Sequence, residues 1–432
     1  MRVASLQTPY RALSRARSAA RAAVVALVFG VELVRAASLA QSPDPKGMKL
    51  VGPIHDQQRA ARQRVEADRV RPTGRLAADY ARMKQRIEDE TGLTFSMEAS
   101  VVSQMGLPGR PVNAIQAMFT PNLNWKPLSG TALGTGSFQF DYLAAQYWST
   151  ANAAELAADL ALNSPLNAYP ANSRFFRQVS YTHEFPGDWL AVTLGQYPFA
   201  SFDGNAYAND QQIGFISNSM SQNGSQNYSK ASLGAYAQIA PGREVTFAAG
   251  FHDANNRTGS SIAFDTAGQG AYSWFLYGAL SPLVAGLGRG QYALFYYNLP
   301  SVAAQPRASD GLSFSASQPV GQDWGLFVRA NTAWNSSFAV QSSIAVGGVL
   351  NDPLGRASAD QVGLGLAWNR TNTSLYPNGF ARPSETMLEV YWNWSFDNHL
   401  LVTPGVQVFV QPALDPDAAM AAVFSLRVTK LF

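Results

Sequence analysis

The sequence predicts an all-β fold, a transmembrane antiparallel β-barrel of about 16 strands preceded by a short N-terminal helical segment. Three observations predict it. Charged residues make up 14% of the 432-residue chain and hydrophobic residues 47%, whereas roughly 25% of residues are charged in a soluble domain. Short segments in which polar and apolar residues alternate recur from residue 93 onward. Turn residues separate these segments, as expected for strands with lipid on one side and water on the other.

Residues 1–40 have the composition of a secretory signal peptide. Arginines are frequent in the first 21 residues, and the apolar run 22–34 is shorter than the roughly 20 residues that a spanning helix needs. Small residues then favour cleavage before Gln41. A short membrane anchor is the alternative. Without this segment, which holds six arginines and one glutamate, 26 basic and 28 acidic residues remain, so no nucleic-acid partner is expected.

Residues 41–92 form a distinct charged segment with 11 basic and 8 acidic residues. Leu76, Tyr80, Met83 and Ile87 recur at spacings of four, three and four, which predicts one apolar face of a helix. We interpret the segment as a charged helical lead-in on the periplasmic side. A short coiled coil that trimerises, or a plug for the pore, is the alternative.

Residues 93–432 are predicted to form the barrel itself. Around residue 328, for example, apolar side chains occupy the even positions from Trp324 to Val328, while the more polar set occupies the odd positions from Gly325 to Asn331. Such alternation puts one set toward lipid and the other toward the lumen. The predicted strands begin near Thr94, Ala114, Ser137, Phe176, Asp188, Ser232, Glu244, Ala271, Gln291, Gly311, Asp323, Phe338, Asp360, Glu385, His399 and Ala422.

The connections between these segments mostly alternate in length. Short periplasmic turns and long external loops are typical of bacterial outer-membrane barrels. Connection 335–337 is short, and 281–290 and 348–359 are long, against this pattern. The tight turns fall at 185–187, 241–243, 319–322 and 397–398, and the long loops at 149–175, 198–231, 253–270, 300–310 and 370–384.

The sequence offers no pattern for catalysis or metal binding. It has no cysteine, its four histidines are widely spaced, and it has no Gly-x-Ser-x-Gly nucleophile motif. We therefore expect no enzymatic activity, no catalytic residue, no metal site and no cofactor.

The phase of the alternation places several polar side chains on the inward face of the barrel. Opposed charges across a narrow lumen orient dipolar solutes. The alternative is that these charges only hold loops in place by ion pairs. The residues predicted to line the pore are Glu98, His252, Arg329, Asn331, Glu389, Asn393, Gln407 and Arg427.

Loop 198–231 is the richest candidate for contact with a solute, because aromatic residues alternate in it with amides and carboxylates. Aromatic rings stack on the C–H faces of sugars, and amides and carboxylates bond to their hydroxyls. An ordinary polar surface loop is the alternative. The helix-like segment 153–160 is a second candidate to fold inward. The predicted sugar contacts are Phe199, Phe202, Asp203, Asn205, Tyr207 and Asp210.

The C-terminal third contains a series of motifs in a fixed order. They are Gly-Leu-Phe-Val-Arg-Ala at 325–330, 345–356 followed by Asp-Gln-Val-Gly-Leu-Gly-Leu at 360–366, and 385–392 leading into 401–408. In these motifs and their order the chain resembles the OprB-type carbohydrate-selective porins. The Gly-Asp-Trp-Gly-Gly step of the family is replaced by Pro-Thr-Gly-Arg at 72–75. The resemblance implies a sixteen-stranded barrel for diffusion of sugars, without a cofactor.

Together these patterns predict an outer-membrane porin of a Gram-negative bacterium, for passive diffusion of carbohydrates and other small hydrophilic solutes. The expected partners are outer-membrane lipid, the sugars that pass, and the barrel-assembly machinery, which we expect to recognise the terminal Phe432. A homotrimer is left open. The alternatives are a general non-selective porin, and a structural envelope protein that uses residues 41–92.

Overall fold

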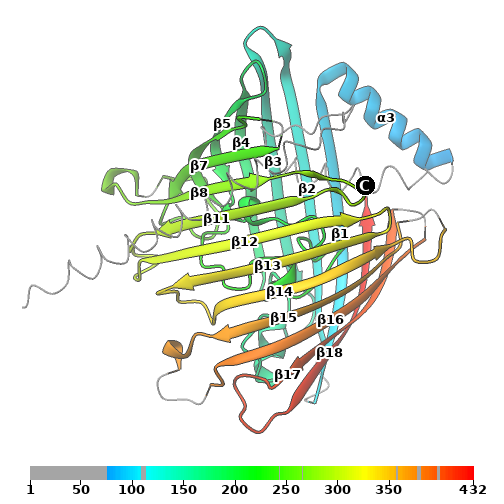
Figure 1. The fold of residues 1–432 in the computed structure, drawn as a ribbon, viewed down its shortest axis with the longest axis vertical. Coiled ribbons are helices and arrows are strands. Elements are labelled where there is room, and N and C mark those ends of the chain that lie inside the picture. The colour runs from blue at the N-terminus through cyan, green and yellow to red at the C-terminus, as the bar shows by residue number, and fades with distance from the viewer. Residues whose placement is uncertain are drawn as a thin grey trace, which may run out of the picture. The chain divides into compact units, whose positions relative to one another are not determined.

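The computed structural model describes residues 75–108, 113–242, 244–264, 266–356, 359–376, 381–396 and 399–432. The predicted signal peptide and the first part of the charged segment lie outside these residues. Within them, 16 strands form one closed antiparallel barrel in which β1 pairs with β18 (Figure 1). Closure leaves no strand edge, so the strand backbones satisfy one another, as a lipid environment requires.

The barrel strands begin within three residues of the predicted positions, and those at Ser232 and Gln291 begin at the predicted residue. In chain order they are β1 (Leu93–Leu107), β2 (Asn113–Thr131), β3 (Gly134–Tyr147), β4 (Ser173–Glu184), β5 (Leu190–Tyr197), β6 (Ser232–Ile239), β7 (Val245–Asp253), β8 (Tyr272–Leu280), β11 (Gln291–Leu299), β12 (Ser309–Val320), β13 (Trp324–Trp334), β14 (Val340–Asn351), β15 (Gln361–Thr371), β16 (Ser384–Ser395), β17 (Leu400–Val410) and β18 (Met420–Leu431).

The short elements lie in the connections. The 281–290 connection, which is long for a turn, contains the two-stranded sheet of β9 (Leu283–Val284) and β10 (Gly288–Arg289). The remaining short elements are α4 (Ala153–Asp159), α5 (Asn218–Ser221), η1 (Phe199–Asp203), η2 (Ala267–Gln269) and η3 (Thr373–Leu375).

The two faces of the strands follow the predicted alternation. Along β13, Trp324 and Leu326 are 51% and 48% exposed, whereas the intervening Phe327 is 2% exposed. Along β15, Leu364 is 54% exposed and Ala367 is fully buried. Outward apolar side chains in a closed barrel are the arrangement that lipid favours. The inward Phe327 shows that the lumen also holds apolar groups.

The helix predicted near residue 80 is α3 (Arg75–Thr91). It lies beside the start of β1 (Figure 1). The Lys84 ammonium sits 5.2 Å from the centre of the Phe95 ring. Met83, which was predicted to lie in an apolar seam, is 43% exposed. The helix ends at Thr91, and the next residue, Gly92, has a positive φ of 70°, which suits glycine. Among the described residues, no helix is long and apolar enough to span a bilayer.

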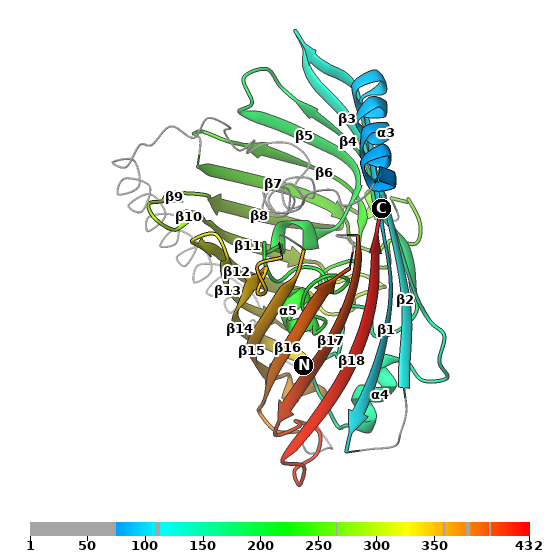
Figure 2. The same cartoon turned by 90° about the vertical axis from the view of Figure 1, so that its right-hand side faces the viewer.

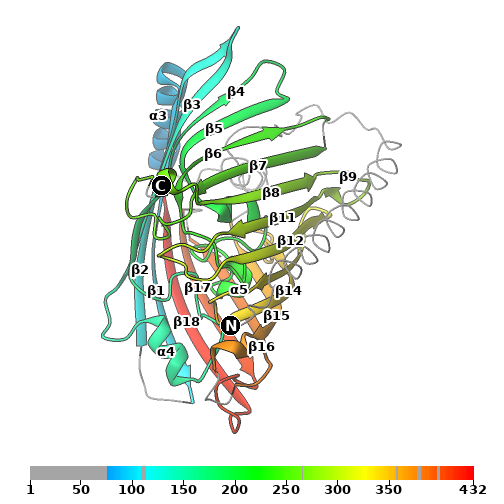
Figure 3. The same ribbon diagram turned by 90° about the vertical axis from the view of Figure 1, so that its left-hand side faces the viewer.

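The two ends of the barrel differ, and we name them by their connections. The turn end is the end at which α3 lies, and most connections there are tight. The loop end is the opposite one, where the long connections 148–172 and 198–231 emerge and where α4 lies next to β1 and β2 (Figures 2 and 3). This agrees with the predicted alternation of connection lengths.

Candidate functional site

The connection between β5 and β6, residues 198–231, lies inside the barrel, and we call it the inner loop. Its Gln212 bonds to Ser100 of β1 and accepts from the Thr120 hydroxyl of β2 at 2.8 Å. On the other side of the lumen, its Asn205 donates to the Ser315 hydroxyl of β12 at 3.0 Å. Figure 2 shows α5, which belongs to this loop, within the ring of strands. The inner loop therefore crosses the lumen.

Arg329 of β13 is the first of three buried charged residues that hold the inner loop. One guanidinium nitrogen donates to the carbonyl oxygens of Ala208 at 2.6 Å and Met220 at 3.1 Å. The other donates to the Asp203 carbonyl and lies 3.7 Å from the Asp203 carboxylate. Arg329 is 1% exposed. It thus joins three separated points of the loop to one strand.

Glu389 of β16 and Arg427 of β18 hold the middle of the inner loop. The Glu389 carboxylate accepts the backbone N–H groups of Ile216 and Ser217 at 2.5 and 2.9 Å. The Arg427 guanidinium donates to the carbonyls of Gln211 and Gly214, the latter at 2.8 Å. Buried charges are costly unless they are paired or hydrogen-bonded, so these contacts favour one position of the loop.

The other residues predicted to line the pore also face inward. Asn331 accepts from the Ser225 N–H at 2.9 Å, and Asn393 donates to the Ile213 carbonyl at 2.6 Å. The His252 ring stacks on Phe199 with centroids 3.7 Å apart. Gln407 donates to Leu166 of the 148–172 loop at 3.1 Å. Glu98 is half-buried on β1. Their placement supports the loop-holding interpretation that the sequence left open, and their contact with solutes stays a prediction.

Four of the six predicted sugar contacts lie on the side of the inner loop that packs against the wall. Phe199 and Phe202 are 0% and 2% exposed, and their rings lie 5.1 and 4.1 Å from that of Phe275. Asp203 and Asn205 are buried in hydrogen bonds to β12 and β13. The physical reason is the cluster of aromatic side chains pointing inward from the wall, which the two phenylalanines cover: Tyr236, Phe275, Tyr277, Phe295 and Tyr297. In this structure the two rings are not displayed for stacking on a solute.

The other two predicted contacts, Tyr207 and Asp210, are half-buried. The Tyr207 ring packs on the backbone of Gly325 of β13 and against the apolar cluster that contains Phe215 and Phe327. The partly exposed polar side chains of the loop are Asn209, Asp210, Gln222 and Gln226. The partly exposed side of the loop therefore carries three amides and one carboxylate, with one aromatic ring lying against the wall.

Arg177 of β4, which the sequence analysis did not identify, faces this side of the loop. Its guanidinium donates to one oxygen of Asp141 from Nε at 2.9 Å and from Nη2 at 2.6 Å, and it interacts electrostatically with Asp210. Tyr169 lies beside these groups and accepts from Gln222 at 3.4 Å. Burial raises the pKa of Tyr169 above its ordinary value, so its hydroxyl stays protonated at neutral pH. A shift in register between β3 and β4 at this point obscured the inward phase of Arg177.

The connection 148–172, which we call the cap loop, covers the inner loop from the loop end. Asn152 caps α4, and the apolar side chains of Leu156 and Leu160 pack beside Gly106 of β1. Glu385 of β16 accepts the N–H groups of Asn163 and Ser164, both at 3.2 Å. The prediction that this segment folds inward agrees with the burial of Leu156, Leu160 and Leu166. Among the described residues, no group of three or more acidic or histidine side chains is arranged to hold a metal.

Comparisons with known proteins agree with this architecture. Residues 269–432 match the family model described as "Carbohydrate-selective porin, OprB family". "Porin AaxA" of Chlamydia felis is 32% identical over 356 residues, which are 80% of this chain and 80% of that protein. "Porin AaxA" of Chlamydia pneumoniae is 30% identical over 350 residues, or 79% of this chain and 80% of that protein.

Solved structures show the same fold. The high-pH structure of Pseudomonas putida OprB superposes with a TM-score of 0.65 at 15% identity, covering 82% of this chain and 97% of that one. The Salmonella typhi OmpF complex with daunomycin superposes with a TM-score of 0.53 at 11% identity, covering 79% of this chain and 97% of that one.

Proposed function

The chain belongs to the OprB family of outer-membrane porins, and on that premise we propose that it is a passive diffusion channel that prefers carbohydrates. The observation that carries the preference is the set of partly exposed side chains on the inner loop. They include Tyr207, whose ring packs on Gly325 of β13, and the amides of Asn209 and Gln222. Arg177 and its partner Asp141 lie on the wall beside Tyr169, to which Gln222 donates.

This arrangement suits a polyhydroxylated solute. An aromatic ring binds the apolar C–H face of a sugar, and amides donate and accept in the same way as its hydroxyls. The charged groups occur as partners, because Arg177 bonds to Asp141 and interacts with Asp210. Paired charges favour dipolar neutral solutes over free ions. The description of the matching family model supports the same preference, and the name of the chlamydial relatives specifies no solute.

Export and assembly are part of the proposal. Residues 1–40 direct secretion in a Gram-negative cell and are then removed. Phe432 is placed at the closing seam of the barrel, since its N–H donates to the Met97 carbonyl at 2.9 Å and its carbonyl accepts from the Met97 N–H at 3.3 Å. An aromatic residue at the closing seam suits recognition by the assembly machinery before β1 and β18 pair.

Liposome swelling tests the preference. Purified protein is reconstituted, and swelling rates are compared for a pentose, a hexose, a disaccharide and amino acids of matched size. We expect the sugars to enter faster than amino acids of the same mass. Equal rates at equal mass support the alternative of a general porin, and no swelling with any solute contradicts both.

Variants on the inner loop locate the preference. Tyr207→Ala and Gln222→Ala are expected to remove the difference between sugars and amino acids while keeping swelling itself. Tyr142→Ala is the matched control, because Tyr142 lies on the outward face of β3, next to the ring of Phe176. An unchanged sugar preference in Tyr207→Ala would show that this side of the loop does not select.

A further inference from the structure

We propose that α3 is an interfacial helix, which lies in the periplasmic leaflet of the outer membrane between the outer wall of the barrel and the lipid headgroups. This inference needs only the outer-membrane barrel and is independent of the solute that passes. It follows from the side of the wall on which α3 lies, the height at which its end is fixed, and the apolar side chain that it leaves exposed.

The chain reverses its direction between α3 and β1. Gly92 has a positive φ of 70°, its N–H donates to the Glu88 carbonyl at 2.8 Å, and its carbonyl accepts from the Lys126 N–H at 2.9 Å. A Cβ at Gly92 would lie 2.5 Å from the Lys126 carbonyl oxygen, so this close turn requires glycine. The helix therefore folds back along the strands, and Figures 1 and 2 show it beside the ends of β1 and β2.

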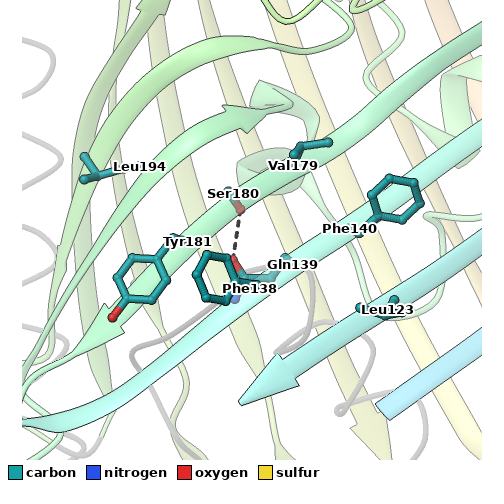
Figure 4. A pocket seen from close by; sticks show the side chains of 8 residues that line it. All are labelled: Leu123, Phe138, Gln139, Phe140, Val179, Ser180, Tyr181 and Leu194. Atoms are coloured by element: carbon teal, nitrogen blue, oxygen red, sulfur yellow. Dashed lines mark hydrogen bonds between the residues drawn. The ribbon is translucent and has the colours of Figure 1, made fainter. Parts of the chain in front are cut away.

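The helix lies on the outward face of β1. The buried, inward residues of this strand have even numbers, as Ser100 and Val102 do, so Phe95 points outward. Its cross-strand neighbour Leu123 lines a groove on the outer wall (Figure 4). The Lys84 ammonium lies 5.2 Å from the centre of the Phe95 ring. The middle of α3 is therefore outside the barrel, and α3 does not plug the pore.

The end of α3 is fixed at the height of an aromatic belt. The Trp125 indole N–H donates to the Thr91 carbonyl at 3.1 Å. The Trp125 and Phe138 rings stack with centroids 5.8 Å apart, and the Phe138 ring lies 5.0 Å from that of Tyr181 (Figure 4). Trp and Tyr gather at the level of the lipid headgroups. Short turns face the periplasm in such barrels, so this belt marks the periplasmic headgroup level.

One side of α3 meets the wall, and an adjoining apolar side chain does not. Tyr80, Lys84 and Ile87 recur at spacings of four and three and are half-buried. Met83 is a surface neighbour of Tyr80 and Ile87 on the helix, because it lies three residues after the one and four before the other. It is nevertheless 43% exposed. Met83 thus continues the apolar outer surface of the barrel, which is already the lipid-facing surface.

The opposite side of α3 is charged, with both signs in equal number. The helix has four basic and four acidic residues. Arg82 pairs with Asp79, and Gln85 donates to Asp89 at 2.9 Å. A narrow apolar stripe with a strongly charged opposite face is typical of helices that lie in the plane of a membrane interface. Because the charges balance, we expect the boundary between headgroups and acyl chains to hold α3, without a requirement for anionic lipid.

Single labels test this placement in the full chain, which contains no cysteine of its own. Met83→Cys carries a nitrobenzoxadiazole fluorophore on the apolar side of α3. Gln85→Cys carries it on the exposed, charged side. Leu364→Cys carries it on the outward wall of β15 and is the control for contact with lipid. Each variant is checked for the folded barrel by heat-modifiable migration on a gel and is reconstituted into phosphatidylcholine vesicles. Quenching is then measured with iodide in the water and with lipids that carry a doxyl group near the headgroup.

We expect the label at Met83→Cys to emit at shorter wavelength than the label at Gln85→Cys, to be quenched by the doxyl lipids as Leu364→Cys is, and to resist iodide. Gln85→Cys should show the reverse. The doxyl quenching at Met83→Cys should persist at high salt, because screening does not weaken apolar contact. Its loss at high salt would overturn the argument from balanced charges.

Two results would overturn the interfacial placement itself. Iodide quenching at Met83→Cys equal to that at Gln85→Cys would place α3 in the periplasm, away from lipid. Protection of Met83→Cys from both quenchers would place it against protein, and disulfide-linked dimers of the unlabelled variant would identify a second copy as the partner. Neither measurement involves conductance or swelling, so the proposed function is tested separately.

The turn at Gly92 supplies a second test. Gly92→Ala, combined with the label at Met83→Cys, should lower doxyl quenching and raise iodide quenching, because the added Cβ meets the Lys126 carbonyl. Gly130→Ala is the matched control, since Gly130 also has a positive φ, of 63°, but has open space around it. Equal quenching in the two variants would overturn the argument that the turn at Gly92 seats α3 on the wall.

Discussion

Replacing Arg427 by methionine is the sharpest test of how the inner loop is held. The guanidinium donates to the carbonyls of Gln211 and Gly214 and to the Asn393 side chain at 3.1 Å. A hydrogen bond that involves a charged group contributes about 1.5–3 kcal/mol. Truncating one member of a buried charged network typically costs about 3–5 kcal/mol, partly because the remaining charge, here Glu389, stays buried. Methionine keeps much of the side-chain volume but none of these bonds.

This loss falls on the loop rather than on the barrel. The strands of the barrel are held by backbone pairing around the whole ring, which Arg427→Met leaves intact. A loop whose closed position is weakened by about 3–5 kcal/mol opens measurably more often. We therefore expect a folded barrel with a larger, noisier single-channel conductance.

Two measurements check this expectation. Hydrogen exchange by mass spectrometry should show faster exchange at residues 211–217 and unchanged exchange in β18. Planar-bilayer recordings should show increased conductance. Arg370→Met is the matched control, because Arg370 is exposed on β15. Wild-type exchange and conductance in Arg427→Met would refute the role given to the guanidinium.

Three further variants test other parts of the interior. Gly365→Val should displace the inner loop near Met220, at a cost of about 1–3 kcal/mol, and should change the conductance. Gly268→Val, at a site with open space, should leave the conductance unchanged. Equal conductance in the two variants would contradict the close contact between Gly365 and Met220. Phe199→Ala should lower the free energy of unfolding by about 3–5 kcal/mol in a denaturant titration in detergent. Phe396→Ala is the control and should change this free energy little, because the Phe396 ring is 65% exposed. Equal losses in the two variants would show that the aromatic cluster does not stabilise the barrel. Arg177→Gln removes the guanidinium that bonds to Asp141 and interacts with Asp210. The reversal potential in a salt gradient should then shift toward cation preference, and a shift toward anions would contradict the placement of these carboxylates.

The sequence alone determined the barrel and, where the alternation is regular, the side of the wall on which a strand residue lies. Alternation has a period of two, so a correct phase at one residue of a strand places all its neighbours, and the Trp324 to Asn331 segment shows this. Counting the alternating segments then predicted about 16 strands. The inward placement of Glu389, Arg427 and Arg329 followed from the same phase.

Which inward residues meet a solute was decided only by the tertiary structure. Residues 198–231 contain the same residue types on both of their sides, so composition marks the loop but not its orientation. That orientation depends on Phe275 and Phe295, which are distant in sequence. Phe199 packs on Phe275 and Phe202 packs on Phe295, and these contacts hold this part of the loop against the wall. Arg177 was missed because a register shift between β3 and β4 breaks the period of two locally.

The row of inward apolar side chains across β14 to β18 likewise needs the closed ring. Each strand of β14 to β18 contributes one apolar inward residue to the row, which is unremarkable within its own segment. Pairing brings Ala345, Ala367, Met387, Phe409 and Ala421 side by side, and two loops from distant parts of the chain then cover them. The local alternation of polar and apolar residues thus determines the face on which a strand residue lies. Whether a loop then buries that residue depends on contacts between distant parts of the chain.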